Sequence, residues 1–209
     1  MTVIALVAAF AAPALSAING NEVSRAVYNV NDVLNEARSY AMSKNTYVYV
    51  GLVSDASTSP SSLVIGMVAS TDGTQTFSPG PPSLNPITKI YRLKNIAAVS
   101  LPAPSANTND QRKMVDAKFK MGDNSFASGT TYSFILSSYT FKGASGQNAG
   151  TNCTSAGILQ IDPQGVVSEV GGDPAPLFEI GLKTVAGNQS NYAALQIAGM
   201  SGAVRIYRP

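Results

Sequence analysis

Two successive patterns of hydrophobic and polar positions occupy residues 1–45. The stretch from Met1 to Ile18 contains no charged residue, and Thr2 and Ser16 are its only polar side chains. From Val23 to Ala41 apolar residues recur in alternating steps of four and three, which places them on one face of an α-helix. The pattern predicts one long helix with an apolar first half (1–20) and an amphipathic second half (21–45).

The two halves of this helix need different surroundings. The apolar half is expected to contact lipid or other protein through its large side chains, Val3, Ile4, Leu6, Val7, Phe10, Leu15 and Ile18. The amphipathic half is expected to pack on the rest of the chain through Val23, Val27, Val30, Leu34, Ala37 and Ala41. Pro13 and Gly20 are predicted points of kinking or local melting, because proline and glycine weaken a helix interior.

The apolar stretch alone leaves several interpretations open. It is slightly shorter than the roughly 20 residues that span a bilayer. It is therefore a membrane helix lacking its first turns, a core helix, or a secretory signal peptide with small residues near Ala14 and Ala17. The signal peptide lacks the basic segment that normally precedes its apolar run. Two unrelated helices of an ordinary domain are a further alternative.

After Asn45 the hydrophobic period changes from helical spacing to two. Short β-branched and aromatic runs alternate with clusters of Gly, Pro, Asn, Asp and Ser, the pattern of antiparallel strands. Residues 46–209 are therefore predicted to form one β-rich head, which makes the chain α+β. The predicted strands are Thr46 to Ser54, Leu63 to Ser70, Lys89 to Leu93, Ile96 to Leu101, Met114 to Met121, Tyr132 to Ser138, Ile158 to Ile161, Phe178 to Val185, Tyr192 to Ala198 and Ala203 to Tyr207.

Two turns and two loops complete this prediction. The clearest hairpin turn is Gly199 to Gly202, where two glycines can supply positive φ angles. A second turn, Asp162 to Gly165, combines proline and glycine. The stretches Asp72 to Pro86 and Gly143 to Gly157 are interpreted as loops.

Composition narrows the classes of function. The chain is 44% hydrophobic and only 12% charged, with a net charge of +2 and no run of basic residues. Nucleic acid is therefore not expected as a partner. Histidine is absent, which excludes Ser-His-Asp and Cys-His catalysis and every histidine-containing metal site. The single cysteine, Cys153, cannot form an intramolecular disulfide and is expected to be inert, in or near a loop.

No constellation of residues predicts an enzyme, a cofactor or a bound metal. The scattered carboxylates show neither a catalytic pairing nor the spacing of a calcium loop; those in the later strands and loops are Asp116, Asp123, Asp162, Glu169, Asp173 and Glu179. Tyr28, Tyr40, Tyr47 and Tyr49 gather near the predicted helix-to-sheet junction. They either form a contact patch between subunits or cover the seam between helix and sheet, and the second interpretation is favoured.

Five stretches carry a resemblance to a known family: 13–20 (PALSAING), 37–48 (ARSYAMSKNTYV), 161–165 (IDPQG), 178–182 (FEIGL) and 194–209 (ALQIAGMSGAVRIYRP). Together they resemble type IV pilin-like proteins of the FimT and type II secretion H-pseudopilin group, whose N termini are cleaved and methylated. They more closely resemble the Verru_Chthon cassette protein D family.

The resemblance implies a pilin or pseudopilin subunit that forms an extracellular, type IV pilus-like filament through bundling of its N-terminal helices. Its implied partners are copies of itself or other pilin-like subunits, the inner membrane before assembly, prepilin peptidase and an assembly machine. The implied location is the inner membrane for the precursor and a filament at the cell surface afterwards. The alternative is a secreted soluble β-domain with a cleaved signal peptide that acts in adhesion or ligand binding.

One feature of such families does not appear in this sequence. Prepilins carry a Gly before the cleavage site and usually a Glu at the fifth mature position, and residues 1–5 contain neither. Either Met1 lies several residues inside the mature helix, or Met1 is the processed end and Ala5 replaces the Glu. The first alignment is preferred, because it restores a full membrane span.

Overall fold

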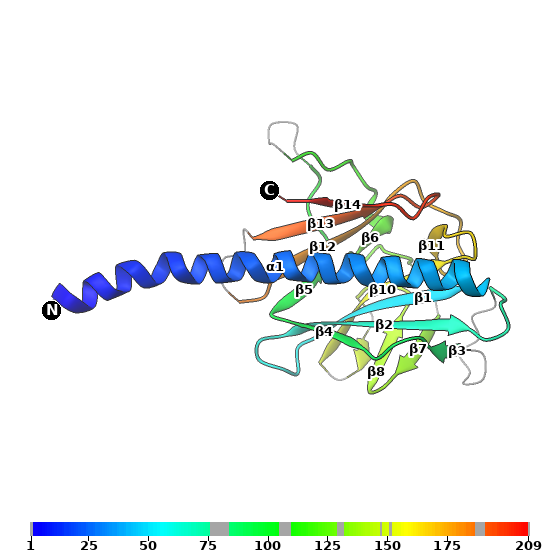
Figure 1. Cartoon of the computed structure of the whole chain (residues 1–209), viewed down its shortest axis with the longest axis horizontal. Helices are drawn as coiled ribbons and strands as arrows, with labels where there is room; N and C mark the ends of the chain where they lie inside the picture. Colours follow the sequence, from blue (N-terminus) through cyan, green and yellow to red (C-terminus); the bar gives the residue numbers. More distant parts are fainter. Residues whose placement is uncertain are drawn as a thin grey trace.

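The computed structural model describes residues 2–75, 84–104, 110–128, 132–146, 148–150, 152–186 and 191–208; side chains are described for all of these except 2–21 and 148–150. A helix, α1 (Thr2–Lys44), is followed by antiparallel sheets, so the chain is α+β as predicted. The helix runs unbroken through Pro13 and Gly20, so the local melting predicted there is wrong. Its first half extends beyond the sheets, and its second half lies along them (Figure 1).

A Schellman motif ends the helix where the hydrophobic period changes. Asn45 has φ of +50°, the left-handed conformation common just after a helix end. The Thr46 N–H donates to the Ala41 carbonyl at 3.1 Å, which satisfies one of the last free carbonyls. The Thr46 hydroxyl then donates to the Ser70 carbonyl at 2.8 Å. The chain is thereby directed from the helix into the first strand.

The larger sheet, sheet A, has the order β11-β10-β1-β2-β3, with β4 also paired to β2 and β9 to β10. Every pairing in it is antiparallel. Its strands are β1 (Val48–Asp55), β2 (Ser62–Ser70), β3 (Leu84–Pro86), β4 (Tyr91–Lys94), β9 (Asn148–Gly150), β10 (Cys153–Ile161) and β11 (Val167–Glu169).

The second sheet, sheet B, has the order β14-β13-β12-β5, and a short β6 pairs with β12 in parallel. The predicted hairpin of Gly199 to Gly202 joins β13 to β14, and only Gly202 has a positive φ, at +63°. The strands of sheet B are β5 (Ile96–Val99), β6 (Lys120–Met121), β12 (Phe178–Thr184), β13 (Tyr192–Ile197) and β14 (Val204–Tyr207); a 3₁₀ turn, η1 (Ala117–Phe119), precedes β6.

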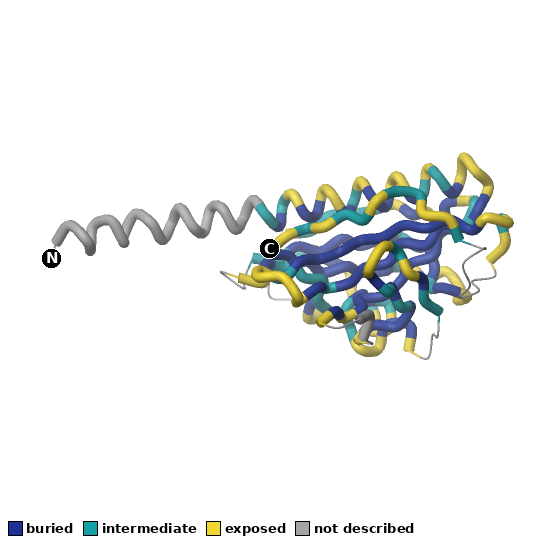
Figure 2. The backbone as a smooth tube through the Cα atoms, turned by 90° about the horizontal axis from the view of Figure 1, so that it is seen from below, coloured by how far each residue is buried: buried dark blue, intermediate teal, exposed yellow. Residues whose placement is uncertain are grey.

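The main core lies between the second half of α1 and the inner faces of both sheets. Alternate residues of the central strands face the helix, among them Leu52, Ile65 and Leu195, all fully buried. The described part of α1 alternates between buried and exposed residues, and the strands beneath it are mostly buried (Figure 2). Burying each Val, Leu or Ile side chain contributes about 1.5–3 kcal/mol, so this interface is the main source of stability.

A hairpin of β7 (Ser133–Leu136) and β8 (Tyr139–Lys142) covers the outer face of sheet A. The Phe141 ring lies on Gly51 and Gly66, which are paired across β1 and β2. A Cβ built on Gly51 would be 2.6 Å from the ring. Glycine at these strand positions is thus explained by the close approach of an aromatic side chain.

Several of the predicted strand and loop boundaries are wrong. The stretch Gly143 to Gly157, interpreted as a loop, contains β9 and the first half of β10; its Gly, Ser and Thr residues have little strand propensity but pair with β1 and with each other. Within Asp72 to Pro86, residues 84–86 form β3, while 76–83 lie outside the described residues. Met114 to Met121 is a strand only at its end. Strands β8 and β11 were not predicted.

Candidate assembly interface

The predicted helix-to-head residues lie on the buried face of α1. Val23, Val27, Val30, Leu34, Ala37 and Ala41 are each at most 4% exposed and belong to one core cluster with the strands of both sheets. Ala26 and Val33 are equally buried on the same face. The sequence interpretation omitted these two, although each lies three residues after a predicted contact, at helical spacing.

The predicted filament-core residues form the first half of the same helix. Their backbone is helical within α1, but their side chains lie outside the described residues; they are Val3, Ile4, Leu6, Val7, Phe10, Leu15 and Ile18. Among the helices of the described residues, none is both long and apolar enough to cross a membrane.

Polar contacts fix the point where α1 leaves the head. Asn95, between β4 and β5, adopts φ of +59° and donates its side-chain amide to the Glu22 carboxylate at 2.6 Å. The Asn95 amide oxygen accepts the Ala186 N–H at 2.9 Å, which ties the end of β12 to the same point. From the C-terminal segment, the Arg208 guanidinium donates to the Ser24 hydroxyl. Two segments distant in sequence therefore hold one turn of the helix, and the end of β12 is joined to it through Asn95.

Two further contacts hold the later turns of α1. The Tyr91 hydroxyl of β4 donates to the Glu36 carboxylate at 3.0 Å, and this hydrogen bond raises the pKa of Tyr91. The Arg38 side chain lies against Gly165 and Gly202, the positive-φ glycines of the two predicted turns. A side chain at either glycine would collide with Arg38. Glycine at these two positions therefore allows both turns to pack closely against the helix.

The outward face of α1 is exposed and polar, and it carries the charges of Arg25, Asp32 and Glu36. Tyr28, Asp32, Asn35, Ser39 and Met42 follow one another in steps of four and three, and all are exposed. Tyr28 is 59% and Met42 51% exposed, which is unusual for side chains of this size. A neighbouring molecule on this face would contact the large side chains of Tyr28 and Met42 together with these charges.

The four tyrosines predicted at the junction do not form one cluster. Tyr28 is exposed on the helix, and Tyr40 packs against the main core beside α1. Tyr47 and Tyr49 instead pack in the second core, on the outer face of sheet A under the β7-β8 hairpin. Only Tyr40 fits the interpretation that these residues cover the seam between helix and sheet.

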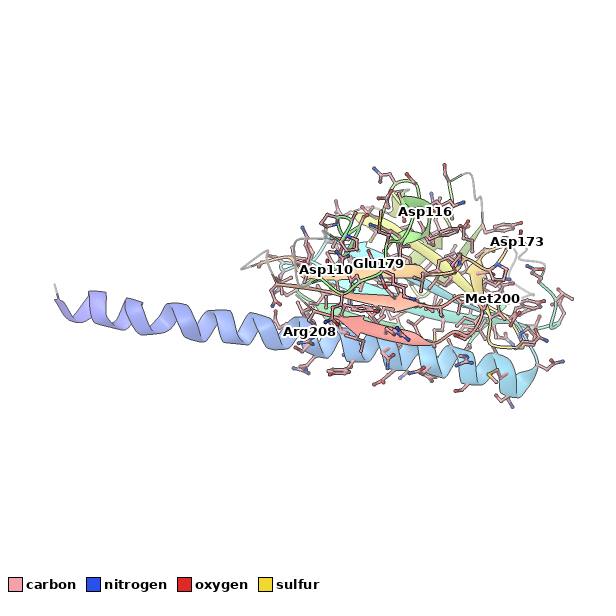
Figure 3. The ribbon with its side chains drawn as sticks, turned by 90° about the horizontal axis from the view of Figure 1, so that it is seen from above. Asp110, Asp116, Asp173, Glu179, Met200 and Arg208 are labelled. Carbon is pink, nitrogen blue, oxygen red and sulfur yellow. The ribbon has the colours of Figure 1, made fainter. Side chains whose placement is uncertain are left out.

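A buried ionic network occupies the outer face of sheet B. The Glu179 carboxylate, 1% exposed, accepts the Arg112 guanidinium at 3.2 Å and the Gln196 amide at 2.9 Å, and Lys120 Nζ is 3.9 Å away. Arg112 also pairs with Asp110 at 2.7 Å; Asp110 and Glu179 are labelled in Figure 3. Every charge here has an opposite partner, so the network fastens the segment around Arg112 to the sheet.

A second polar cluster surrounds Asp55 at the end of β1. The Tyr139 hydroxyl donates to the Asp55 carboxylate at 2.7 Å, and Arg92 Nη1 lies 3.6 Å from it. Burial opposes ionisation of Asp55, but hydrogen bonds from Ser57 and Tyr139 and the charge of Arg92 outweigh burial and lower its pKa. Cys153, predicted in or near a loop, is the first residue of β10 and directly follows the turn at Asn152; burial and the nearby Asp55 raise the pKa of its thiol.

Neither polar cluster resembles a metal centre. Across the part of the chain that the structure describes, no three Cys, Asp or Glu side chains are placed to hold a metal ion. Comparison of the chain with family models, with curated proteins and with solved structures finds no match. The surfaces of α1 are therefore the strongest candidate for a functional site.

Proposed function

We propose that this protein is a pilin-like structural subunit, a pilin or pseudopilin, of an extracellular type IV pilus-like filament. The observation that carries the proposal is the division of one unbroken helix. Its first charged residue is Glu22, and the head is fastened to α1 from Glu22 and Val23 onward. The preceding turns extend beyond the head without a charge in their sequence (Figure 1).

This division suits a subunit that exchanges one apolar environment for another. Before assembly, the first half of the helix lies in the inner membrane, where a helix satisfies its own backbone hydrogen bonds. In the filament the same halves bundle in the core, and lipid contacts are replaced by helix contacts. The many alanines among residues 5–12 allow neighbouring helices to approach closely.

The head would then form the outer layer of the fibre. The outward face of α1, with its exposed Tyr28 and Met42, provides a lateral contact surface for the next subunit. Prepilin peptidase and an assembly machine belong to the proposal through the sequence resemblance alone.

Disulfide cross-linking in the fibre core tests this proposal. Cys153 is the chain's only cysteine, so a Cys153→Ser background leaves no other thiol. Phe10→Cys in that background should give a covalent dimer when sheared fibres are oxidised with copper phenanthroline, because the one thiol of each chain forms one disulfide, and monomers after prior solubilisation in detergent. A mature chain that begins near Ile18 would lack the introduced thiol altogether and would favour a secreted binding domain instead.

A further inference from the structure

Three exposed cationic side chains surround the point where α1 leaves the head, and we call them the cationic collar: Arg25, Lys94 and Arg208. Arg25 is on the helix one turn after Glu22, Lys94 ends β4, and Arg208 follows β14. The turn after β4 and the C terminus both lie at this end of the head (Figure 1). The fold therefore gathers charges from three distant parts of the sequence.

The collar charges form no ion pair with the described residues of the head. Among the described residues, neither Arg25 nor Lys94 has an ion-pair partner, and the side chain to which Arg208 donates, Ser24, is neutral. Arg25 and Lys94 line a surface cavity of about 310 Å³. Arg92 lines it too, but its charge is directed to Asp55. Among the described residues of the cavity wall, the one acidic group is Glu22, which accepts the Asn95 amide.

The opposite end of the head has a different character. Asp72 lies beside the helix end in a second cavity with Lys44. Asp162 begins the turn whose Gly165 contacts Arg38, and Figure 3 shows Asp173 and Met200 at the end remote from Arg208. Aspartates thus outnumber cations there, whereas cations predominate where the helix emerges.

We propose that the cationic collar binds the anionic head groups of phospholipids while the first half of α1 lies in the bilayer. This inference rests on the proposed function, because only a membrane-inserted subunit brings the collar to the lipid surface. A helix whose first charged residue is Glu22 places the next turn at the head-group layer. Each basic side chain held near an anionic surface strengthens binding by about fivefold at physiological salt.

The collar would orient the subunit before assembly. Three contacts around the helix exit hold the head upright on the membrane, with the outward face of α1 directed sideways toward neighbouring subunits. Because such contacts are screened by salt, the orientation should weaken as ionic strength rises.

Lysine acetylation of the full-length chain tests the inference, with two exposed lysines at opposite ends of the head as reporters. The chain is reconstituted in vesicles of phosphatidylcholine alone or of an equal mixture with phosphatidylglycerol, and both lysines are labelled with a water-soluble acetylating reagent. We expect Lys94 to be protected about fivefold in the anionic vesicles only, and Lys44 to react equally in both. Replacing Arg25 and Arg208 by Gln should remove most of that protection, whereas Asp173→Asn should not.

Three results would overturn the inference. Equal protection of Lys94 in both vesicles would mean simple steric shielding by the bilayer. Absence of protection in chains that float with the vesicles would mean that the head stands clear of the lipid. Protection that depends on the protein-to-lipid ratio and not on phosphatidylglycerol would indicate contact with a second copy of the chain. Failure to float with either vesicle would instead contradict the proposed function, so the two failures are distinguishable.

Discussion

The two halves of α1 share one secondary structure but differ in what holds them. The second half buries an apolar face against two sheets and is fastened by Asn95, Tyr91 and Arg208. The first half has no charged residue in its sequence and extends past the head (Figure 1). The difference shows that one continuous helix can serve two roles: among the described residues, the second half supplies the packing that stabilises the head, and we propose that the first half packs on other subunits.

The largest expected effect comes from charging the packed half. Replacing Val30 and Leu34 together by Asp buries two carboxylates without partners in the main core. We expect a loss of more than about 4 kcal/mol of unfolding free energy, and no stable accumulation of the chain. Since the chain contains no tryptophan, near-ultraviolet circular dichroism of its tyrosines follows unfolding in denaturant. A folded double variant would contradict the assignment of the packed half.

A smaller loss is expected from breaking the ionic network behind sheet B. Glu179→Gln leaves Arg112 and Lys120 without their shared carboxylate, and should cost about 3 kcal/mol of unfolding free energy. The matched control is Glu36→Gln, which alters an exposed carboxylate with one hydrogen bond from Tyr91 and should cost about 1 kcal/mol or less. Equal losses in the two variants would show that the buried network adds nothing to stability.

Stability should also fall at both extremes of pH, through groups of the head. Hydrogen bonds and nearby cations lower the pKa values of Asp55 and Asp110 in the fold, so the stability they contribute is lost as pH falls below about 4, where unfolded aspartates bind protons. Burial raises the pKa values of Tyr49 and Tyr139, so stability is also lost above about pH 10. Denaturant midpoints measured across pH check both the acidic and the alkaline loss of stability. Tyr139→Phe should reduce the loss at alkaline pH. A flat profile would contradict these assignments.

A charge introduced into the first half of α1 is expected to have the smallest effect on folding. Its effect on assembly should be large. Leu6→Asp should change the unfolding free energy of the head by less than about 0.5 kcal/mol, because the backbone of the first half of α1 extends beyond the sheets (Figure 1). The same variant should abolish incorporation into fibres, because a carboxylate is costly in lipid and in an apolar helix bundle. Immunoblots of sheared fibres, with denaturant unfolding of the purified chain, check both expectations. Normal incorporation would contradict the bundling role.

Sequence reasoning recovered the features that depend on local pattern. The helical face of α1, the β13-β14 hairpin and the turn at Asp162 each follow from spacing or from turn residues close together in the chain. The first half of β10 was missed because its Gly, Ser and Thr residues become a strand only through pairing with β1. Tertiary context overrode local propensity there.

The polar contacts of the candidate site could not be predicted for a related reason. Glu179 and Arg112 are 67 residues apart, and Glu22 and Asn95 are 73 apart. No periodicity links such pairs, since the topology of the sheets alone brings them together. The cationic collar likewise consists of isolated charges in the sequence, and it becomes a surface only when β4 and the C-terminal segment meet the helix.

Electron cryomicroscopy of fibres sheared from cells, with mass spectrometry of the subunit's N-terminal peptide, tests the central claim most directly. The account predicts helical fibres whose core contains the first half of α1 and whose outer layer is the head, with residues 2–18 retained in the mature chain. Soluble monomers that begin near Ile18 would contradict it and would identify the apolar stretch as a cleaved signal peptide.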